Sequence, residues 1–404
     1  MLTHSYYDED PRVRREAESL VLAGRPVDVY ALRRPEDPPE SIVDGVAVRR
    51  LDVQRHQGAG IATYVREYLS FLGRAAIAAT AANRARRYAL VQVHTLPDFL
   101  VFAVLHFRLA GVPLVLDLHE AMPEFFRLRF PGAATPLVQR ALLLQERASI
   151  LAADAVITVN EALAGRLLDL GVPPQKVRIV RNTPDLTRFD PAREPSRTFM
   201  QDGELRLVYA GALTPTYELD VAIGALIELR RERPGLVVRL DLYGRGDSTD
   251  DLVERTIAHG LTDRVTFHGR IQIEAVPAAI AAADIGIAPT RRTDFTDYSL
   301  STKIFEYAAM GKPVVASRLP LVERTLGRAV ATYEPGSSPS LADTLLDIVD
   351  DAARRTDLTV RAAARLEDLS WDREAERYHE LVESLAADGE ARPTEAARVS
   401  SAVP

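Results

Sequence analysis

The chain of 404 residues contains no cysteine, which excludes disulfide bonds, thiolate metal sites and a thiol nucleophile together. It also lacks any run of about 18 or more uncharged apolar residues, the least that spans a bilayer as a helix. Its first residues have no apolar segment of the signal-peptide kind. We therefore expect a cytoplasmic protein, either free or at the inner face of the membrane, whose chemistry comes from carboxylates, His, Lys, Arg or the substrate.

Acidic residues outnumber basic ones, 57 to 50. The formal net charge is −7, and residues 1–190 are slightly basic whereas the remainder is acidic. This imbalance is too mild to predict a nucleic-acid partner, for which a strongly basic face is expected. A comparatively basic first half would suit a domain that faces an anionic acceptor or a lipid surface.

Short β-branched runs alternate with longer amphipathic stretches, which is typical of βα units and parallel sheets. The fold class predicted is therefore α/β, with two Rossmann-like halves. The expected strands of the first half are Val27–Leu32, Val46–Val53, Leu90–His94, Leu114–His119, Ala155–Val159 and Val177–Val180, and the expected helices lie around 11–23, 61–86, 97–109, 134–152 and 161–169. The expected strands of the second half are Leu205–Ala210, Val237–Tyr243, Val265–Phe267, Ile285–Ala288 and Pro313–Ala316.

The chain divides into two domains at a segment that shows neither the helical nor the strand periodicity of apolar residues. Residues 182–200 are rich in proline and polar residues, so we expect a first domain at 1–185, a linker at 186–200 and a second domain at 201–370. Residues 371–386 are predicted to form a last helix, and residues 387–404 a disordered polar tail. Only Met1–Thr3 precede the first polar residues, so the first strand is either a stub or truncated by a start codon placed too late; we favour the second.

The segment STKIFEYAAMGKPVVAS, residues 301–317, carries the strongest functional signal. Lys303 and Glu306 are three residues apart, so on a helix they share a face near its N-terminus, where backbone N–H groups already attract anions. The lysine can neutralise phosphate charge, and the carboxylate can accept hydrogen bonds from both hydroxyls of a ribose. This pattern favours a nucleoside diphosphate site; the alternative is an exposed helix with a surface ion pair.

Other candidate residues follow the ends of predicted strands, where ligands bind in such sheets. Each has an ordinary alternative: a surface hydrogen bond for the His-Glu pair, a tight turn for the glycines and a solvated loop for the arginines. The segment Phe125–Phe130 interleaves aromatic and basic residues, which is consistent with membrane contact or with half-buried packing. The strand-end candidates are Asp117, His119 and Glu120; Gly211 and Ala212; Gly244 and Arg245; and Arg291 and Arg292.

Together these motifs make the chain resemble the family 4 glycosyltransferases of the GT-B fold, over residues 5 to 385. The segments that carry the resemblance are STKIFEYAAMGKPVVAS, VRIVRNTPD, LVYAGALTP, YGRGD and VTFHGRI. The resemblance implies two facing Rossmann-like domains and a C-terminal helix, containing Trp371, that crosses back to the first domain. It also implies a retaining transfer of a sugar from a nucleotide-diphosphate donor, without metal or other cofactor.

By this resemblance Glu306 would hold the donor ribose, Lys303 the diphosphate, and Gly211 the phosphate through its backbone. The donor set would also include Ala212, Gly244, Arg245, Arg270, Ile271, Arg292 and Thr302, with Arg270 and Ile271 at the base. His119 would lie near the transferred sugar, so His119, Lys303 and Glu306 are the expected catalytic residues. The cleft and acceptor set would be His4, Asp117, His119, Glu120 and Asn182.

Three positions depart from the family pattern. Ala212 and Tyr217 stand where the family often has an arginine and a lysine, and Tyr298 stands where a glutamate is usual. Diphosphate binding must then fall on Lys303 with Arg292 or Arg245. We expect a hexosyltransferase in polysaccharide or glycolipid assembly, with a saccharide or lipid-linked acceptor; the alternatives are a nucleotide-sugar epimerase and a catalytically silent binding protein of the same fold.

Overall fold

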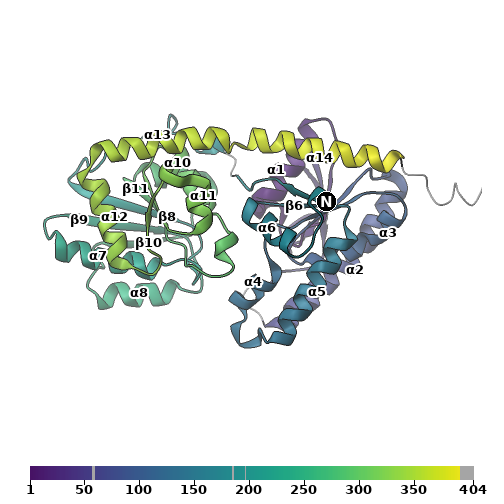
Figure 1. The fold of residues 1–404 in the computed structure, drawn as a ribbon, viewed down its shortest axis with the longest axis horizontal. Helices are drawn as coiled ribbons and strands as arrows, with labels where there is room; N and C mark the ends of the chain where they lie inside the picture. The colour runs from purple at the N-terminus through teal and green to yellow at the C-terminus, as the bar shows by residue number, and fades with distance from the viewer. Residues whose placement is uncertain (57–59, 184–185, 196, 392–404) are drawn as a thin grey trace, which may run out of the picture. The chain divides into compact units, whose positions relative to one another are not determined.

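The computed structural model describes residues 1–56, 60–183, 186–195 and 197–391. These form two compact units, each a central sheet flanked by helices (Figure 1). The first unit is Met1–Asn182 together with the C-terminal helix from Asp372 onward, and the second is Thr183–Trp371. Each unit is described by itself below.

The first unit is built on parallel strands that are buried on both faces. β4 (Val91–His94), β5 (Leu114–Asp117), β6 (Ala155–Thr158) and β7 (Val177–Ile179) lie in that order and are all parallel. β1 (Asp28–Leu32) pairs with β3 (Val46–Leu51) in parallel, and β2 (Glu40–Val43) pairs with β3 in antiparallel fashion. β1, β4, β5 and β6 are buried at every position, as expected for strands covered by helices on both sides.

The N-terminal segment lies between β1 and β4. Leu2 bridges Tyr30 on one side and Val93 on the other, both in parallel. Its N–H donates to the carbonyl of Gln92 and its carbonyl accepts from the N–H of His94, each at 2.9 Å. This short segment therefore supplies the hydrogen bonds of a strand between β1 and β4.

The helices of the first unit follow the predicted ranges closely, and three of them begin with a side-chain cap. Asp10, Thr135 and Asn160 accept from the backbone N–H groups of Val13, Val138 and Leu163. The α-helices are α1 (Pro11–Leu22), α2 (Ile61–Arg86), α3 (Leu105–Leu109), α4 (Met122–Arg129), α5 (Pro136–Ala152) and α6 (Glu161–Asp169), and the 3₁₀ helices are η1 (Tyr7–Glu9), η2 (Asp98–Val104), η3 (Pro131–Ala133) and η4 (Pro174–Lys176).

The second unit has a six-stranded, fully parallel sheet in the order β10-β9-β8-β11-β12-β13. Its strands are β8 (Glu204–Ala210), β9 (Val237–Tyr243), β10 (Val265–Gly269), β11 (Ile285–Ala288), β12 (Val314–Ser317) and β13 (Ala331–Tyr333). Its helices are η5 (Leu186–Arg188), α7 (Leu219–Glu232), α8 (Thr249–Ala258), η6 (Ile273–Ala275), α9 (Val276–Ala281), η7 (Thr296–Tyr298), α10 (Thr302–Ala309), α11 (Pro320–Leu326), η8 (Gly327–Ala329), α12 (Ser338–Asp350) and α13 (Ala352–Asp368).

The described part of the predicted linker packs on the second unit. Phe189 is buried in a core cluster with Val208 and Ile304. Nε of Arg197 donates to Asp284 at 3.1 Å, which joins this segment to the loop before β11. Residues 186–200 are thus held to the second unit wherever the structure describes them.

The C-terminal helix α14 (Trp371–Ala391) returns to the first unit, as the predicted crossover helix requires. Tyr378 is fully buried there, and Glu374 accepts from the backbone N–H of Arg181 at 2.9 Å. The helix runs past the predicted end at 386 and includes part of the expected tail. Residues 392–404, the rest of that tail, lie outside the described residues.

Candidate functional site

Lys303, in the first turn of α10, packs against the aromatic rings of Tyr209 and Tyr217. Its side chain is buried, and Nζ donates to the Tyr217 hydroxyl at 3.2 Å. The same nitrogen lies 4.3 Å from the ring centroid of Tyr217 and 5.3 Å from that of Tyr209. Because a cation is attracted to the face of an aromatic ring, these contacts fix the ammonium at the start of the helix.

Glu306 lies one turn further along α10 and is half-buried. Burial raises the pKa of its carboxyl, and the neighbouring charge of Lys303 opposes that rise. At the start of the helix the Ser301 hydroxyl is buried without a hydrogen-bond partner among the described residues and does not cap the helix. The N-terminal end of α10 therefore carries Lys303 and Glu306 together with the first backbone N–H groups of the helix. An anion is favoured at such a helix end.

The glycine loops after β8 and β9 pack against each other beneath Lys303. A Cβ on Gly211 would overlap Cε of Lys303, and a Cβ on Gly244 would overlap the carbonyl oxygen of Gly211. The N–H of Gly211 donates to Tyr243 and that of Gly244 donates to Gly269, each at 2.8 Å. These two N–H groups already donate to backbone carbonyls, so they are not available to a phosphate. The two glycines instead make room for Lys303. A phosphate at this position would be bound by the Lys303 ammonium and by the first backbone N–H groups of α10.

The predicted arginines of the second unit lie in different settings. Arg245 is exposed and passes close to Gly269, and Arg270 is exposed beyond the end of β10. Arg292 pairs with Asp297 at 3.3 Å on the surface. The structure therefore brings Gly211, Gly244 and Lys303 into contact but gives no contact of Arg292 with that group. Ala212 and Ile271 follow Gly211 and Arg270 in the same loops, and Thr302 is the first residue of α10.

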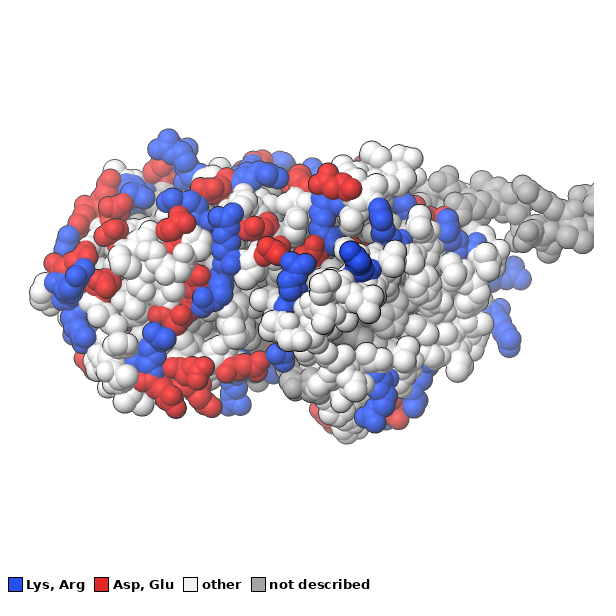
Figure 2. Space-filling model, turned by 60° about the horizontal axis from the view of Figure 1, so that its bottom comes forward, with Lys and Arg blue, Asp and Glu red and all other residues white. Residues whose placement is uncertain are grey.

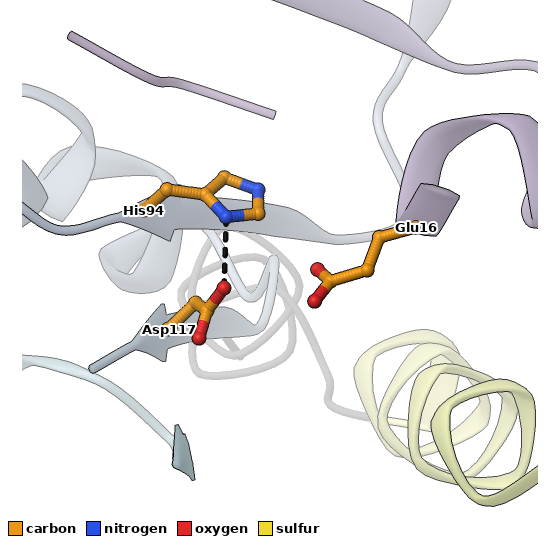
Figure 3. A group of neighbouring side chains, drawn as sticks. All are labelled: Glu16, His94 and Asp117. Atoms are coloured by element: carbon orange, nitrogen blue, oxygen red, sulfur yellow. Dashed lines mark hydrogen bonds and ion pairs between the residues drawn. The ribbon is translucent and has the colours of Figure 1, made fainter. Parts of the chain in front are cut away.

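In the first unit, Asp117 at the end of β5 is the centre of a buried polar network (Figure 3). It accepts from Nε of Arg12 at 2.6 Å, from a second guanidinium nitrogen of Arg12, and from Nδ1 of His94 at 2.8 Å. Burial would raise the pKa of Asp117, but the Arg12 guanidinium and the His94 hydrogen bond hold it well below its usual value. Asp117 is therefore a fixed buried anion.

The network continues from Arg12 to the C-terminal helix. Oε1 of Glu16 lies 3.5 Å from Nε of Arg12, and Oε2 accepts from the Gln92 amide at 2.6 Å. Gln92 in turn accepts from the Tyr378 hydroxyl at 2.6 Å. A continuous set of polar contacts thus links α14 to the end of β5.

Glu16, His94 and Asp117 lie close enough together to resemble a set of metal ligands (Figure 3). However, the Arg12 guanidinium is hydrogen-bonded to Asp117 and lies beside Glu16, so a fixed positive charge already lies against both carboxylates. A divalent cation would have to displace it against charge repulsion. The donor set therefore does not fit a metal ion.

The other predicted residues of the first unit lie at different depths. Nδ1 of His119 lies 4.0 Å from Asp117 and has no hydrogen-bond partner among the described residues. Burial lowers the pKa of His119 to about 4, although Asp117 opposes this. Burial raises the pKa of Glu120, and Asn182 accepts from Arg15 at 2.6 Å. His4 is buried, and its ring is edge-on to Tyr68 and Phe71.

Sequence reasoning missed the residues that orient these groups, although a signal was present. Arg12 and Glu16 are charged residues on the apolar stripe of α1, beside Val13 and Ala17, and Gln92 interrupts an apolar strand. A charge on a buried stripe must be paired, so these positions could have been singled out.

Comparisons with known proteins agree with this two-unit architecture. Residues 10–183 match the family described as "Glycosyl transferase 4-like domain", and residues 204–351 match "Glycosyl transferases group 1". Among curated proteins, the chain is 27% identical over 406 residues to a D-inositol 3-phosphate glycosyltransferase of Kineococcus radiotolerans, covering 93% of this chain and 91% of the relative.

Two solved structures share the fold. Sucrose-phosphate synthase from Thermosynechococcus elongatus superposes with a TM-score of 0.76 at 19% identity, covering 96% of this chain and 98% of the other. Anabaena HepE in complex with UDP-glucose superposes with a TM-score of 0.67 at 17% identity, covering 95% and 98%. The predicted GT-B fold is therefore confirmed.

Proposed function

We propose that this chain, which belongs to the glycosyltransferases of the GT-B fold, moves a sugar from a nucleotide-diphosphate donor to a saccharide or lipid-linked acceptor. In the proposed reaction the anomeric configuration is retained and no metal takes part. The observation that carries the proposal is the shared face of Lys303 and Glu306, one turn apart at the N-terminal end of α10.

The donor half of the proposal follows from the charges at that turn. When the bond between sugar and diphosphate breaks, negative charge grows on the leaving diphosphate. Lys303 is held by Tyr209 and Tyr217, so its ammonium needs little reorganisation to meet that charge. The oxygens of Glu306 would accept from the ribose hydroxyls, and the complex of HepE with UDP-glucose supports a nucleotide sugar as the donor class.

The sugar half of the proposal concerns His119. Its lowered pKa keeps the imidazole neutral near pH 7, so it can exchange hydrogen bonds with sugar hydroxyls without adding a positive charge. In the proposed retaining route the departing diphosphate takes the proton of the acceptor hydroxyl, so no protein base is required.

Turnover of the full-length chain with UDP-, GDP- and ADP-sugars and acceptor saccharides tests the proposal. A thermal-shift screen of UDP, GDP and ADP first selects the base, because a ligand that binds the folded state raises its stability. Lys303→Ala and Glu306→Ala should each lower turnover at least about 100-fold, which is the order of losses for electrostatic groups of this kind. Glu323→Ala, which removes an exposed carboxylate from α11, is the matched control and should leave turnover unchanged.

Unchanged turnover in both variants, with the fold intact, would overturn the assignment. Incubation of the nucleotide sugar without acceptor separates the two alternatives. Interconversion of the sugar would identify an epimerase, and tight nucleotide binding without any transfer would identify a silent binding protein. Inversion at the anomeric carbon of the product would refute the retaining route alone.

A further inference from the structure

One layer of helices on the first unit exposes an unusual set of side chains. The 3₁₀ helix η2 packs against both α2 and α5, and α3 continues from it, so these elements form one layer (Figure 1). More than half of the large apolar side chains that are exposed in the described chain lie on it. They are Val65, Leu69 and Ile77 of α2, Phe102 of η2, Leu109 of α3, and Leu137, Leu144 and Leu151 of α5.

On α5 these side chains form one stripe with arginines. Leu137, Leu144 and Leu151 are 77%, 65% and 69% exposed and recur every seven residues, which places them on one face of the helix. Arg140 and Arg147 occupy the positions between them on the same face and are also exposed. The outer stripe of α5 therefore alternates leucine and arginine along most of its length.

The layer exposes charge of one sign only. Arg66, Arg74 and Arg84 are exposed on α2; the first two lie between its exposed apolar residues and Arg84 lies beyond them. The acidic residues of α2, η2, α3 and α5 are all buried; they are Glu67, Asp98 and Glu146. In Figure 2 blue and red atoms are mixed over the left side, which carries the second unit, whereas the right side is mainly white with scattered blue and few red atoms. An apolar, basic face on a chain of net charge −7 is a local feature and not a consequence of composition.

We propose that this apolar basic face, made by α2, η2, α3 and α5, lies on the surface of an anionic lipid bilayer. Amphipathic helices of this composition bury their apolar side chains at the boundary between headgroups and acyl chains, and their arginines pair with acidic headgroups. The purpose of this membrane binding, to bring the enzyme to a lipid-linked acceptor, rests on the proposed function. The binding itself does not.

Other occupants fit the face less well. A second copy docked on the same face would bring arginine stripes together, and the buried acids could not neutralise them. A single-stranded nucleic acid would need aromatic platforms for its bases, and this face is mainly aliphatic. The aromatic and basic segment considered from the sequence is half-buried beside this face: Phe126 and Phe130 pack on each other with ring centroids 5.2 Å apart, and Phe130 also packs on Tyr64 of α2 at 6.0 Å.

Vesicle sedimentation with the full-length protein tests the proposal. Vesicles of phosphatidylcholine alone are compared with vesicles of phosphatidylcholine and phosphatidylglycerol in a two-to-one ratio. Binding is expected only to the anionic vesicles and should weaken as salt is added. Arg74→Gln combined with Arg140→Gln removes one cation from each helix and should weaken binding about tenfold or more. Leu144→Gln should also weaken binding, because an apolar contact is lost.

Ile257→Gln is the matched control, since Ile257 is an exposed apolar residue on α8 of the second unit. It should leave vesicle binding unchanged. Thermal melting of each variant shows that the fold is retained. Absence of binding to anionic vesicles, or equal binding to both compositions, would overturn the proposal. A dimer in sedimentation velocity that Leu144→Gln dissociates would assign the face to a second copy instead. Vesicle binding is measured without turnover. A failure of the proposed sugar transfer would therefore be distinguishable from a failure of membrane binding.

Discussion

The hydroxyl of Tyr378 donates to Oε1 of Gln92 at 2.6 Å, although the two residues are 286 positions apart in the sequence. Both side chains are buried, and Gln92 leads through Glu16 and Arg12 to Asp117. The C-terminal helix is therefore tied to the polar network beside His119 by side chains as well as by apolar packing.

Replacing Tyr378 by Phe should destabilise the protein by about 1 to 3 kcal/mol, because Oε1 of Gln92 is left buried without a donor. Urea denaturation followed by circular dichroism measures the change. Glu380→Gln, an exposed substitution on the same helix, is the control and should have little effect. A Tyr378→Phe variant as stable as the wild type would show that water replaces the hydroxyl.

The stability of the protein should fall in acid partly because of His4. Burial lowers the pKa of His4 in the folded protein to about 4, whereas an unfolded histidine titrates near 6.5. The unfolded state then binds the proton first, so this contribution is fully present above pH 6.5 and is lost as pH falls from about 6.5 to about 4. The shift corresponds to a loss of up to about 3 kcal/mol.

The variant His4→Phe should flatten that part of the stability profile while keeping the edge-on contacts with Tyr68 and Phe71. Urea midpoints at a series of pH values, compared with the wild type, measure the difference. Substitution of the exposed His259 by Gln controls for the loss of a histidine as such. Parallel profiles of wild type and His4→Phe would contradict the expected role.

Gly244→Ala should disturb the loops under Lys303, because its Cβ would overlap the carbonyl oxygen of Gly211 and backbone must move. We expect a loss of stability of about 1 to 3 kcal/mol and weaker nucleotide binding. Thermal shift with and without nucleotide measures both effects. Gly235→Ala has open space around it and serves as the control. Undiminished nucleotide binding by Gly244→Ala would separate these loops from the donor site.

Chelation of metal ions should change neither stability nor turnover. In the cluster of Glu16, His94 and Asp117 the Arg12 guanidinium already lies against both carboxylates, so the cluster should not need a divalent ion. Melting curves and rates after dialysis against EDTA, and after addition of Zn²⁺, measure this. A rise in melting temperature with Zn²⁺ that Glu16→Gln abolishes would show that the cluster binds metal after all.

Much of the fold could be predicted from the sequence because buried parallel strands produce distinct apolar runs. β9 and β11 begin and end at the predicted residues, and α2 and α6 match their expected ranges. β2 was missed because half of its residues are exposed at the edge of the sheet, so it lacks an apolar run. β13 (Ala331–Tyr333) was missed because its three residues include no Val, Ile or Leu, so it lacks the apolar run that marks the equally short β7.

The site was harder to predict than the fold. The placement of Lys303 and Glu306 on one turn follows from their spacing, which a helix fixes. The ring of Tyr217 against Lys303 depends on a loop that comes from another part of the chain, and spacing carries no information about it. The same holds for Arg12 and Asp117, which lie on different elements 105 positions apart.

The return of α14 has a consequence for biosynthesis. Tyr378 fills a place in the first unit, yet it is made only after the whole second unit has been translated. Until then Gln92 has no partner from α14, and the apolar surface beneath that helix stays open to water and chaperones. The unit that is synthesised first is therefore the last to be completed on the ribosome.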